Sequence, residues 1–234
     1  MSLQEVADYL HLSVQDVERL VKRGEIPCER QGARTVFMSA EIEGWASQRL
    51  LGSKSEGLKE FHTKSTAKVK SVALDTALIP QLLSETSIRP ELTSRTRASV
   101  IGDMAELAES TGLVASREDL LTSLRDREAL CSTALPGGLA LLHPRHHDPY
   151  AFDESFIVLG RTPHPIPFGA PDGKETDIFF LVCCQDDRLH LHTLARLCVI
   201  LTKTPVLLVL RQVSTAREML NALIDAETAV LLNH

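Results

Sequence analysis

The sequence predicts an α/β protein with a small helical domain at its N-terminus, and three observations lead to this. Residues 1–50 carry apolar side chains at helical spacing behind successive serine caps. Residues 51–72 hold five lysines against two glutamates, a composition that buries little apolar surface and indicates a basic linker. From residue 73 onward, helical patterns alternate with short apolar runs. We therefore expect domains at 1–50 and 73–234.

Composition is that of an ordinary globular protein, with 44% apolar and 24% charged residues. No run approaches the roughly 18 apolar residues that span a bilayer. The first residues lack the basic and apolar regions of a secretion signal, and the five cysteines are irregularly spaced. We therefore expect a cytoplasmic protein with free thiols and no membrane partner. The net charge of -6 argues against bulk attraction to nucleic acid, although a local basic surface is compatible with it.

Two helices are predicted in the first 24 residues. Ser2 followed by Glu5 forms a capping box for the first helix. Ser13 caps the second helix, with Asp16 at the matching position, and Gly24 ends it.

A hairpin and a third helix follow. Residues 25–38 place a Gly turn between two short extended stretches. Ser39 is expected to cap the third helix, with Ile42 and Trp45 on its apolar side.

The second domain is expected to alternate helices with strands. Gly112 closes a helix over 94–112, and Ser116 with Asp119 opens another. The predicted strands cover 138–142, 155–160 and 177–184, and the later helices cover 191–202 and 214–226. Residues 206–210 stay ambiguous, because periodicity cannot separate strand from helix in so short a run.

The first domain resembles the excisionase and MerR-type winged helix-turn-helix family. The order and spacing of Leu3–Leu10, Leu12–Val21 and Arg23–Pro27 carry this resemblance, with a wing and a closing helix that holds Trp45. In that family the second helix enters the major groove. The resemblance implies DNA contacts from the second helix and the wing, by Gln15, Arg19, Lys22, Arg30 and Arg34.

Charge on this domain works against DNA binding. Six basic residues face eight acidic ones, and Asp16 and Glu18 lie on the helix that would meet DNA. Phosphate contacts supply most non-specific affinity. Two interpretations therefore stay open, namely DNA binding and a structural or protein-docking role.

Residues from about 73 to the end resemble the IIA domain of the fructose/mannitol class of the bacterial sugar phosphotransferase system, and most of all its nitrogen-regulatory branch. Four elements carry the resemblance: Leu120–Glu128 with Ser132-Thr133, Gly138–His143, Pro167–Lys174 and His190–Ala195. The resemblance implies a mixed β-sheet flanked by helices.

A phosphohistidine site is implied by the same resemblance. His143 would accept a phosphoryl group from an HPr-like carrier protein, since neutral imidazole is a competent nucleophile. Arg127 would bind the phosphoryl oxygens with its planar, always-charged guanidinium. His190, at the start of a helix, would donate a hydrogen bond to them. Ser132 and Thr133 could contact phosphate or cap the next turn. No cofactor is expected.

Three residues depart from the family's pattern. Leu142 stands where the family usually has Pro, Pro144 stands where Gly is common, and Cys131 stands where Gly is frequent. Pro144 also has no N–H to offer a phosphate. Three interpretations remain: a phosphorylated regulator coupled to a DNA-binding domain, a plain phosphocarrier, and a degenerate IIA-like domain that binds a regulated target without taking phosphate.

The histidines also raise the question of a metal site. His143, His146, His147, His190 and His192 could in principle supply zinc ligands. No zinc motif supports this, and two of these residues stand in a polar loop. We therefore expect no metal, and we expect His192 to be a packing or supporting residue.

Overall fold

The computed structural model divides into two compact units, residues 1–74 and 75–234, which are described separately. It describes residues 1–10, 12–32, 34–52, 77–145 and 150–232. Apart from residues 51 and 52, which end a helix, the predicted linker lies outside these ranges.

The first unit contains a helical pair, a hairpin and a longer helix: α1 (Leu3–Tyr9), α2 (Val14–Arg23), β1 (Glu29–Gln31), β2 (Arg34–Val36) and α3 (Ser39–Gly52). The predicted caps of the first two helices are confirmed. Ser2 and Glu5 form a capping box on α1, and the Ser13 side chain accepts the Asp16 amide on α2. Gly24 ends α2 at φ +66°, in the left-handed region where glycine meets no Cβ penalty.

The start of α3 differs from the prediction. Ser39 is its first residue and not its cap, because the Met38 carbonyl already accepts the amides of Glu41 and Ile42. The Trp45 indole on α3 donates to the Glu25 carbonyl at 2.6 Å. This bond ties the helix to the segment that leads into the hairpin.

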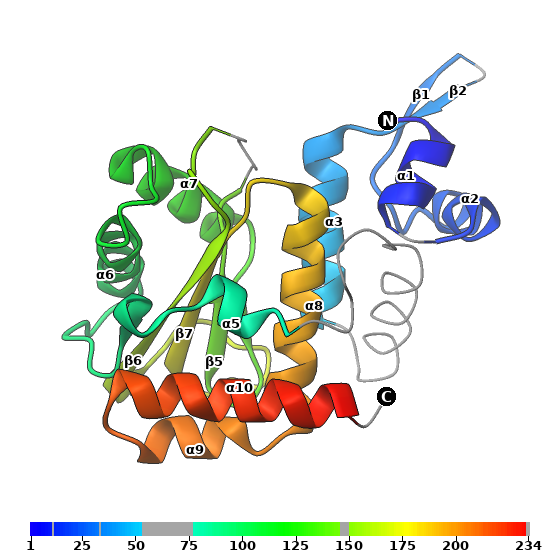
Figure 1. Ribbon diagram of the computed structural model, residues 1–234. Coiled ribbons are helices and arrows are strands. Elements are labelled where there is room, and N and C mark those ends of the chain that lie inside the picture. Colours follow the sequence, from blue (N-terminus) through cyan, green and yellow to red (C-terminus); the bar gives the residue numbers. More distant parts are fainter. Residues whose placement is uncertain (11, 33, 53–76, 146–149, 233–234) are drawn as a thin grey trace. The chain divides into compact units, whose positions relative to one another are not determined.

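The second unit is built on a five-stranded mixed sheet with the order β3-β6-β7-β5-β4 (Figure 1). Its strands are β3 (Ile88–Arg89), β4 (Ala134–Leu135), β5 (Leu139–Leu142), β6 (Phe156–Ile166) and β7 (Thr176–Cys183). The β3–β6 and β5–β7 pairs are parallel, while β6–β7 and β4–β5 are antiparallel. The mixed sheet implied by the resemblance to the IIA family is therefore confirmed.

The strands differ from the prediction in two ways: β6 is longer than expected, and two short strands were not predicted. Strand β6 runs six residues past position 160, through a register irregularity between Arg161 and Ile166. This stretch contains Pro163 and Pro165, which normally argue against a strand. Strands β3 and β4 were not predicted, because two residues carry no readable alternation.

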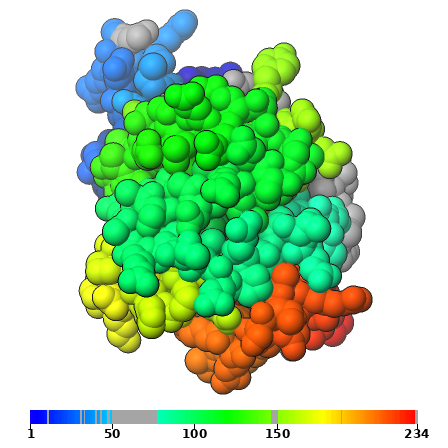
Figure 2. Space-filling view, turned by 90° about the vertical axis from the view of Figure 1, so that its left-hand side faces the viewer, coloured from blue at the N-terminus to red at the C-terminus, as the bar shows by residue number. Residues whose placement is uncertain are grey.

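Helices cover both faces of the sheet. They are α5 (Ile79–Leu82), the 3-10 turn η1 (Glu85–Ser87), α6 (Arg97–Glu109), α7 (Arg117–Leu130), α8 (Asp187–Lys203), α9 (Val206–Gln212) and α10 (Ala216–Leu232). Figure 1 shows α6 and α7 on one side of the sheet, α8 on the other, and α9 with α10 across one end. Figure 2 views the unit from the α6 side, where the atoms of α6 and α7 form a continuous cover.

Side chains that accept backbone amides set the first residues of α7, α8 and α10. Ser116 caps α7 through the Asp119 amide, as predicted. Helix α8 begins four residues before the predicted position, because Asp186 caps it by accepting the Leu189 amide. Helix α10 begins at Ala216, two residues after the predicted position, and the Thr215 hydroxyl accepts the Glu218 amide at its start.

The ambiguous segment after Pro205 is helical and forms α9. Within the described ranges, no single helix is long and apolar enough to cross a membrane. Leu189–Lys203 and Val206–Gln212 meet that test only as a pair, bent by 81° at their junction.

Candidate functional site

His143 directly follows β5, a fully buried strand of the central sheet. Its Nδ1 lies 2.9 Å from the Leu141 carbonyl oxygen, which can only accept a hydrogen bond. Nδ1 therefore carries the proton, and the lone pair of the neutral ring is on Nε2. That lone pair accepts a hydrogen bond from Nε of Arg127 at 2.9 Å.

Arg127 comes from the last turn of α7. Its Nη1 donates to the Cys131 carbonyl at 3.1 Å and contacts the Cys131 sulfur at 3.4 Å. Its Nη2 is buried and has no hydrogen-bond partner among the residues that the structure describes. Buried donors without a partner are rare, so this one marks a place where an anion can be bound.

His190 lies on α8, with its ring centroid 4.9 Å from that of His143. It is the fourth residue of α8 and not its first, because Asp186 caps the helix and its carbonyl accepts the His190 amide. The ring is thus one turn inside the helix. The structure nevertheless brings Arg127, His143 and His190 together, each with 2% or less of its surface exposed.

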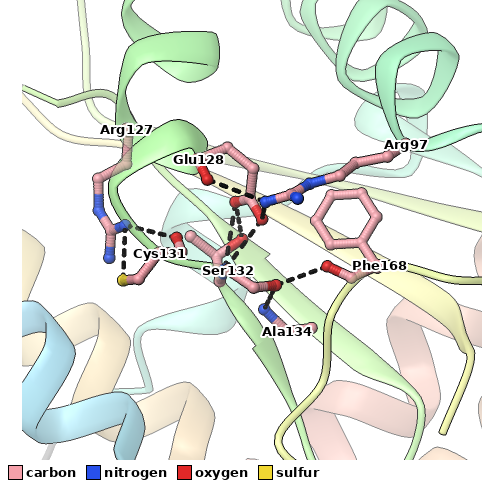
Figure 3. A network of polar contacts seen from close by, with 8 residues as sticks. Arg97, Arg127, Glu128, Cys131, Ser132, Ala134 and Phe168 are labelled. Carbon is pink, nitrogen blue, oxygen red and sulfur yellow. Dashed lines mark hydrogen bonds and ion pairs between the residues drawn. The ribbon is translucent and has the colours of Figure 1, made fainter. Parts of the chain in front are cut away.

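The hydroxyls of Ser132 and Thr133 both form hydrogen bonds within the fold, and Figure 3 shows those of Ser132. Ser132 donates to the Phe168 carbonyl at 2.6 Å and accepts the Ala134 amide at 3.1 Å. Thr133 donates to the Glu128 carboxylate at 2.6 Å. Of the two roles left open for this pair, these bonds favour the structural one.

The two described residues after His143 offer no free backbone N–H to an anion. Pro144 has no N–H, and the Arg145 amide donates to the Ser123 hydroxyl at 2.9 Å. Leu142 is buried in β5, opposite Leu181 of β7. Among the described residues, Arg127 is therefore the main donor that this site offers to an anion.

The residues expected to contact DNA are exposed in the first unit. Gln15, Arg19 and Lys22 lie on α2, while Arg30 and Arg34 lie on the two hairpin strands. Arg19 pairs with Asp16 at 3.1 Å, which offsets part of its charge. The hairpin arginines thus supply cations on a second element besides α2.

The described part of the chain holds no group of three His, Cys, Asp or Glu residues that could bind a metal ion. His146 and His147, which belonged to the zinc alternative, lie outside the described residues.

Two family models match the chain. The model "Phosphoenolpyruvate-dependent sugar phosphotransferase system, EIIA 2" matches residues 81–226, and a helix-turn-helix domain model matches residues 1–50. A curated relative, the fructose-specific EIIABC component of the phosphotransferase system from Bacillus subtilis (strain 168), is 23% identical over 130 residues. That match covers 55% of this chain but only 20% of the relative, so the chain spans a small part of the relative's length.

Solved structures agree with the second unit's fold. The nitrogen regulatory protein IIA-Ntr from Neisseria meningitidis is 27% identical, with a TM-score of 0.56 over 63% of this chain and 99% of that chain. IIA mannitol from Escherichia coli is 20% identical, with a TM-score of 0.52 over 60% of this chain and 98% of that chain. The second likeness is one of fold alone.

Proposed function

Because the chain belongs to the EIIA 2 family of the phosphoenolpyruvate-dependent sugar phosphotransferase system and carries an N-terminal helix-turn-helix domain, we propose that it is a phosphohistidine-controlled regulator. His143 accepts a phosphoryl group from an HPr-like carrier, and its modification state alters the binding of DNA or of a target protein. One observation carries the proposal: the neutral His143 ring presents its Nε2 lone pair to Arg127.

The transfer is a displacement at phosphorus. The Nε2 lone pair of His143 forms the new P–N bond, the P–N bond to the carrier's histidine breaks, and the carrier's ring keeps that electron pair. Positive charge that develops on the accepting ring is stabilised because Nδ1–H already donates to the Leu141 carbonyl. Since phosphoryl transfer depends mostly on positioning and charge stabilisation, few protein groups are needed.

Arg127 has to change partners during this step. Its Nε–H occupies the Nε2 lone pair in the unmodified protein, so the guanidinium must move off the ring before attack. The Nη2 donor, which has no partner in the described part of the chain, can then bind the phosphoryl oxygens. Since His143 and Arg127 are both buried, carrier access also requires the Nε2 edge to open.

A labelling experiment tests the site. The full chain is incubated with phosphoenolpyruvate, enzyme I and HPr, and its phosphate content is measured by mass spectrometry. We expect wild type and His164→Ala, a control at an exposed histidine of β6, to take up one acid-labile, base-stable phosphoryl group, and His143→Ala to take up none. Label on His143→Ala overturns the site. If wild type takes up no phosphate while a control IIA domain is labelled, the proposal fails and the protein is a degenerate IIA-like regulator that binds its target without phosphate.

The DNA-binding half of the proposal has its own test, a gel shift against genomic fragments at low salt. The Arg30→Ala/Arg34→Ala variant should bind more weakly, with a salt slope reduced by about 1 per lost phosphate contact. Arg117→Ala, an exposed change in the second unit, should bind like wild type. No retention of wild type at micromolar protein would favour the protein-docking role.

A further inference from the structure

A cluster of polar and aromatic contacts surrounds the end of α7, directly after Arg127 (Figure 3). We call this cluster the α7 clamp, and its members are Arg97, Glu128, Ser132, Thr133 and Phe168. We propose that the α7 clamp sets the position of the Arg127 guanidinium and thereby controls phosphoryl exchange at His143. The consequence for exchange rests on the proposed function, whereas the positioning of Arg127 does not.

Glu128 is the centre of the α7 clamp. Its carboxylate is almost fully buried and accepts a bond from Arg97 Nη2 at 2.6 Å. It also accepts the Thr133 amide at 3.1 and 3.2 Å and the Thr133 hydroxyl at 2.6 Å. A buried carboxylate is tolerated only when it is paired in this way, so these bonds hold the segment after α7 against the helix end.

Arg97 joins two helices through this centre. It is the first residue of α6, and its Nη2 also donates to the Glu128 backbone carbonyl at 2.9 Å. That carbonyl is among the last four of α7, which a helix leaves without an internal partner. The guanidinium lies over the Phe168 ring at 5.4 Å. The start of α6 therefore fixes the end of α7.

The loop before β7 completes the α7 clamp. The Phe168 carbonyl accepts the Ser132 hydroxyl at 2.6 Å. Gly169 has φ +90°, and a Cβ there would lie 3.2 Å from the Ser132 Cβ, so glycine permits this close approach. The contact gives a structural reason for the Pro167–Lys174 element of the family's sequence pattern.

The α7 clamp reaches Arg127 through Cys131. The Cys131 carbonyl, one residue before the Ser132 anchor, accepts Arg127 Nη1 at 3.1 Å, while Nε is held on His143 at 2.9 Å. Because the guanidinium is planar, these two bonds define its plane and the direction of Nη2, which no other described residue contacts by a hydrogen bond. Displacing the Cys131 carbonyl would release the guanidinium. The clamp side chains are thus positioning residues that act through Arg127.

Two variants test the α7 clamp. Glu128→Gln removes the charge at its centre, and Arg97→Met removes the link to α6. The Arg97 side chain is 41% exposed and Glu128 keeps its bonds to Thr133, so we expect Arg97→Met to fold with reduced stability. We expect each variant to slow phosphoryl transfer from HPr by up to about 100-fold, because a displaced guanidinium leaves Nε2 open but no longer lies where its Nη2 can bind the phosphoryl oxygens. We also expect the imidazole ¹⁵N resonances of unphosphorylated His143 to shift as its Nε2 loses the Arg127 bond, and Arg97→Lys to restore part of both properties.

Arg161→Met is the matched control. Arg161 donates to the carbonyls of Pro90, Leu210 and Val213, so it is a polar anchor of the same kind on β6. We expect this variant to lose stability but to keep the wild-type His143 resonances. Folded clamp variants with wild-type resonances and rates would overturn the inference. So would equal resonance shifts in Arg161→Met, which would reveal a global effect on stability.

The two proposals fail in different ways. If wild type takes no phosphate, the proposed function fails, yet the His143 resonances of the unmodified variants still decide whether the clamp positions Arg127. If wild type is labelled and the clamp variants behave like wild type, only the clamp inference fails.

Discussion

Arg196 on α8 and Glu227 on α10 form an ion pair at 3.1 Å, with side chains 1% and 0% exposed. The Glu227 carboxylate also accepts the Leu78 and Ile79 amides, each at 2.9 Å. Burial lowers the pKa of Arg196, and the nearby Glu227 charge opposes that shift. Since removing one partner leaves the other charge buried and uncompensated, we expect Glu227→Gln to cost about 3–5 kcal/mol of unfolding free energy.

The size of the effect can be expressed as a melting temperature. In a unit of this length each kcal/mol moves the midpoint by about 2–4 °C, so Glu227→Gln should lower it by roughly 6–20 °C. The glutamine has one acceptor oxygen where the carboxylate had two, so a backbone amide at the start of α5 also loses its partner.

Two optical probes assign the loss to the second unit. Far-UV circular dichroism follows the helices of both units, most of which lie in the second, whereas Trp45, the single tryptophan, lies on α3 and reports on the first unit. We expect the first signal to melt earlier in Glu227→Gln and the second to stay unchanged. Asp225→Asn, an exposed change on the same helix, should have an effect within about 0.5 kcal/mol. A loss below about 1 kcal/mol in Glu227→Gln would show that the pair contributes no more than a surface pair and would refute the argument from burial.

Three further predictions follow from local features. Burial raises the pKa of the Cys184 and Cys198 thiols to about 12 and also raises that of Cys183, so at about pH 8 these thiols are protonated and should resist alkylation in the native state. Mass analysis should find the label at the more accessible cysteines, Cys28 and Cys131; rapid modification of Cys198 would contradict this. Gly160→Ala should lower the free energy of unfolding by about 1–3 kcal/mol, because a Cβ would lie 2.5 Å from Leu92 Cδ1. Denaturant titration measures this, and an unchanged midpoint would show that the core repacks around the added methyl group without loss of stability. Ser13→Ala should destabilise the first unit by about 1 kcal/mol through loss of the α2 cap, measured by Trp45 fluorescence, and a stability equal to wild type would show that this cap contributes nothing.

Helix ends were predicted correctly from the sequence where the capping residue and its partner are only a few positions apart. The Ser2–Glu5 box and the Ser116 cap join residues three apart, and a glycine ends α2. The predicted start of α8 was wrong because Asp186, a capping residue upstream of that position, begins the helix at Asp187. Prediction also failed where a strand was too short for a pattern, as with β3.

By itself the sequence determined the two kinds of domain and pointed to His143, Arg127 and His190, through motifs that occupy consecutive positions. Tertiary structure alone decided which imidazole nitrogen faces the guanidinium, because Leu141 and Arg127 approach the ring from different elements. It alone joined Arg97 to Glu128, 31 residues apart. Local hydrogen bonds follow from the order of a few residues, whereas contacts between buried charges depend on how helices and sheet pack, and no short pattern records that packing.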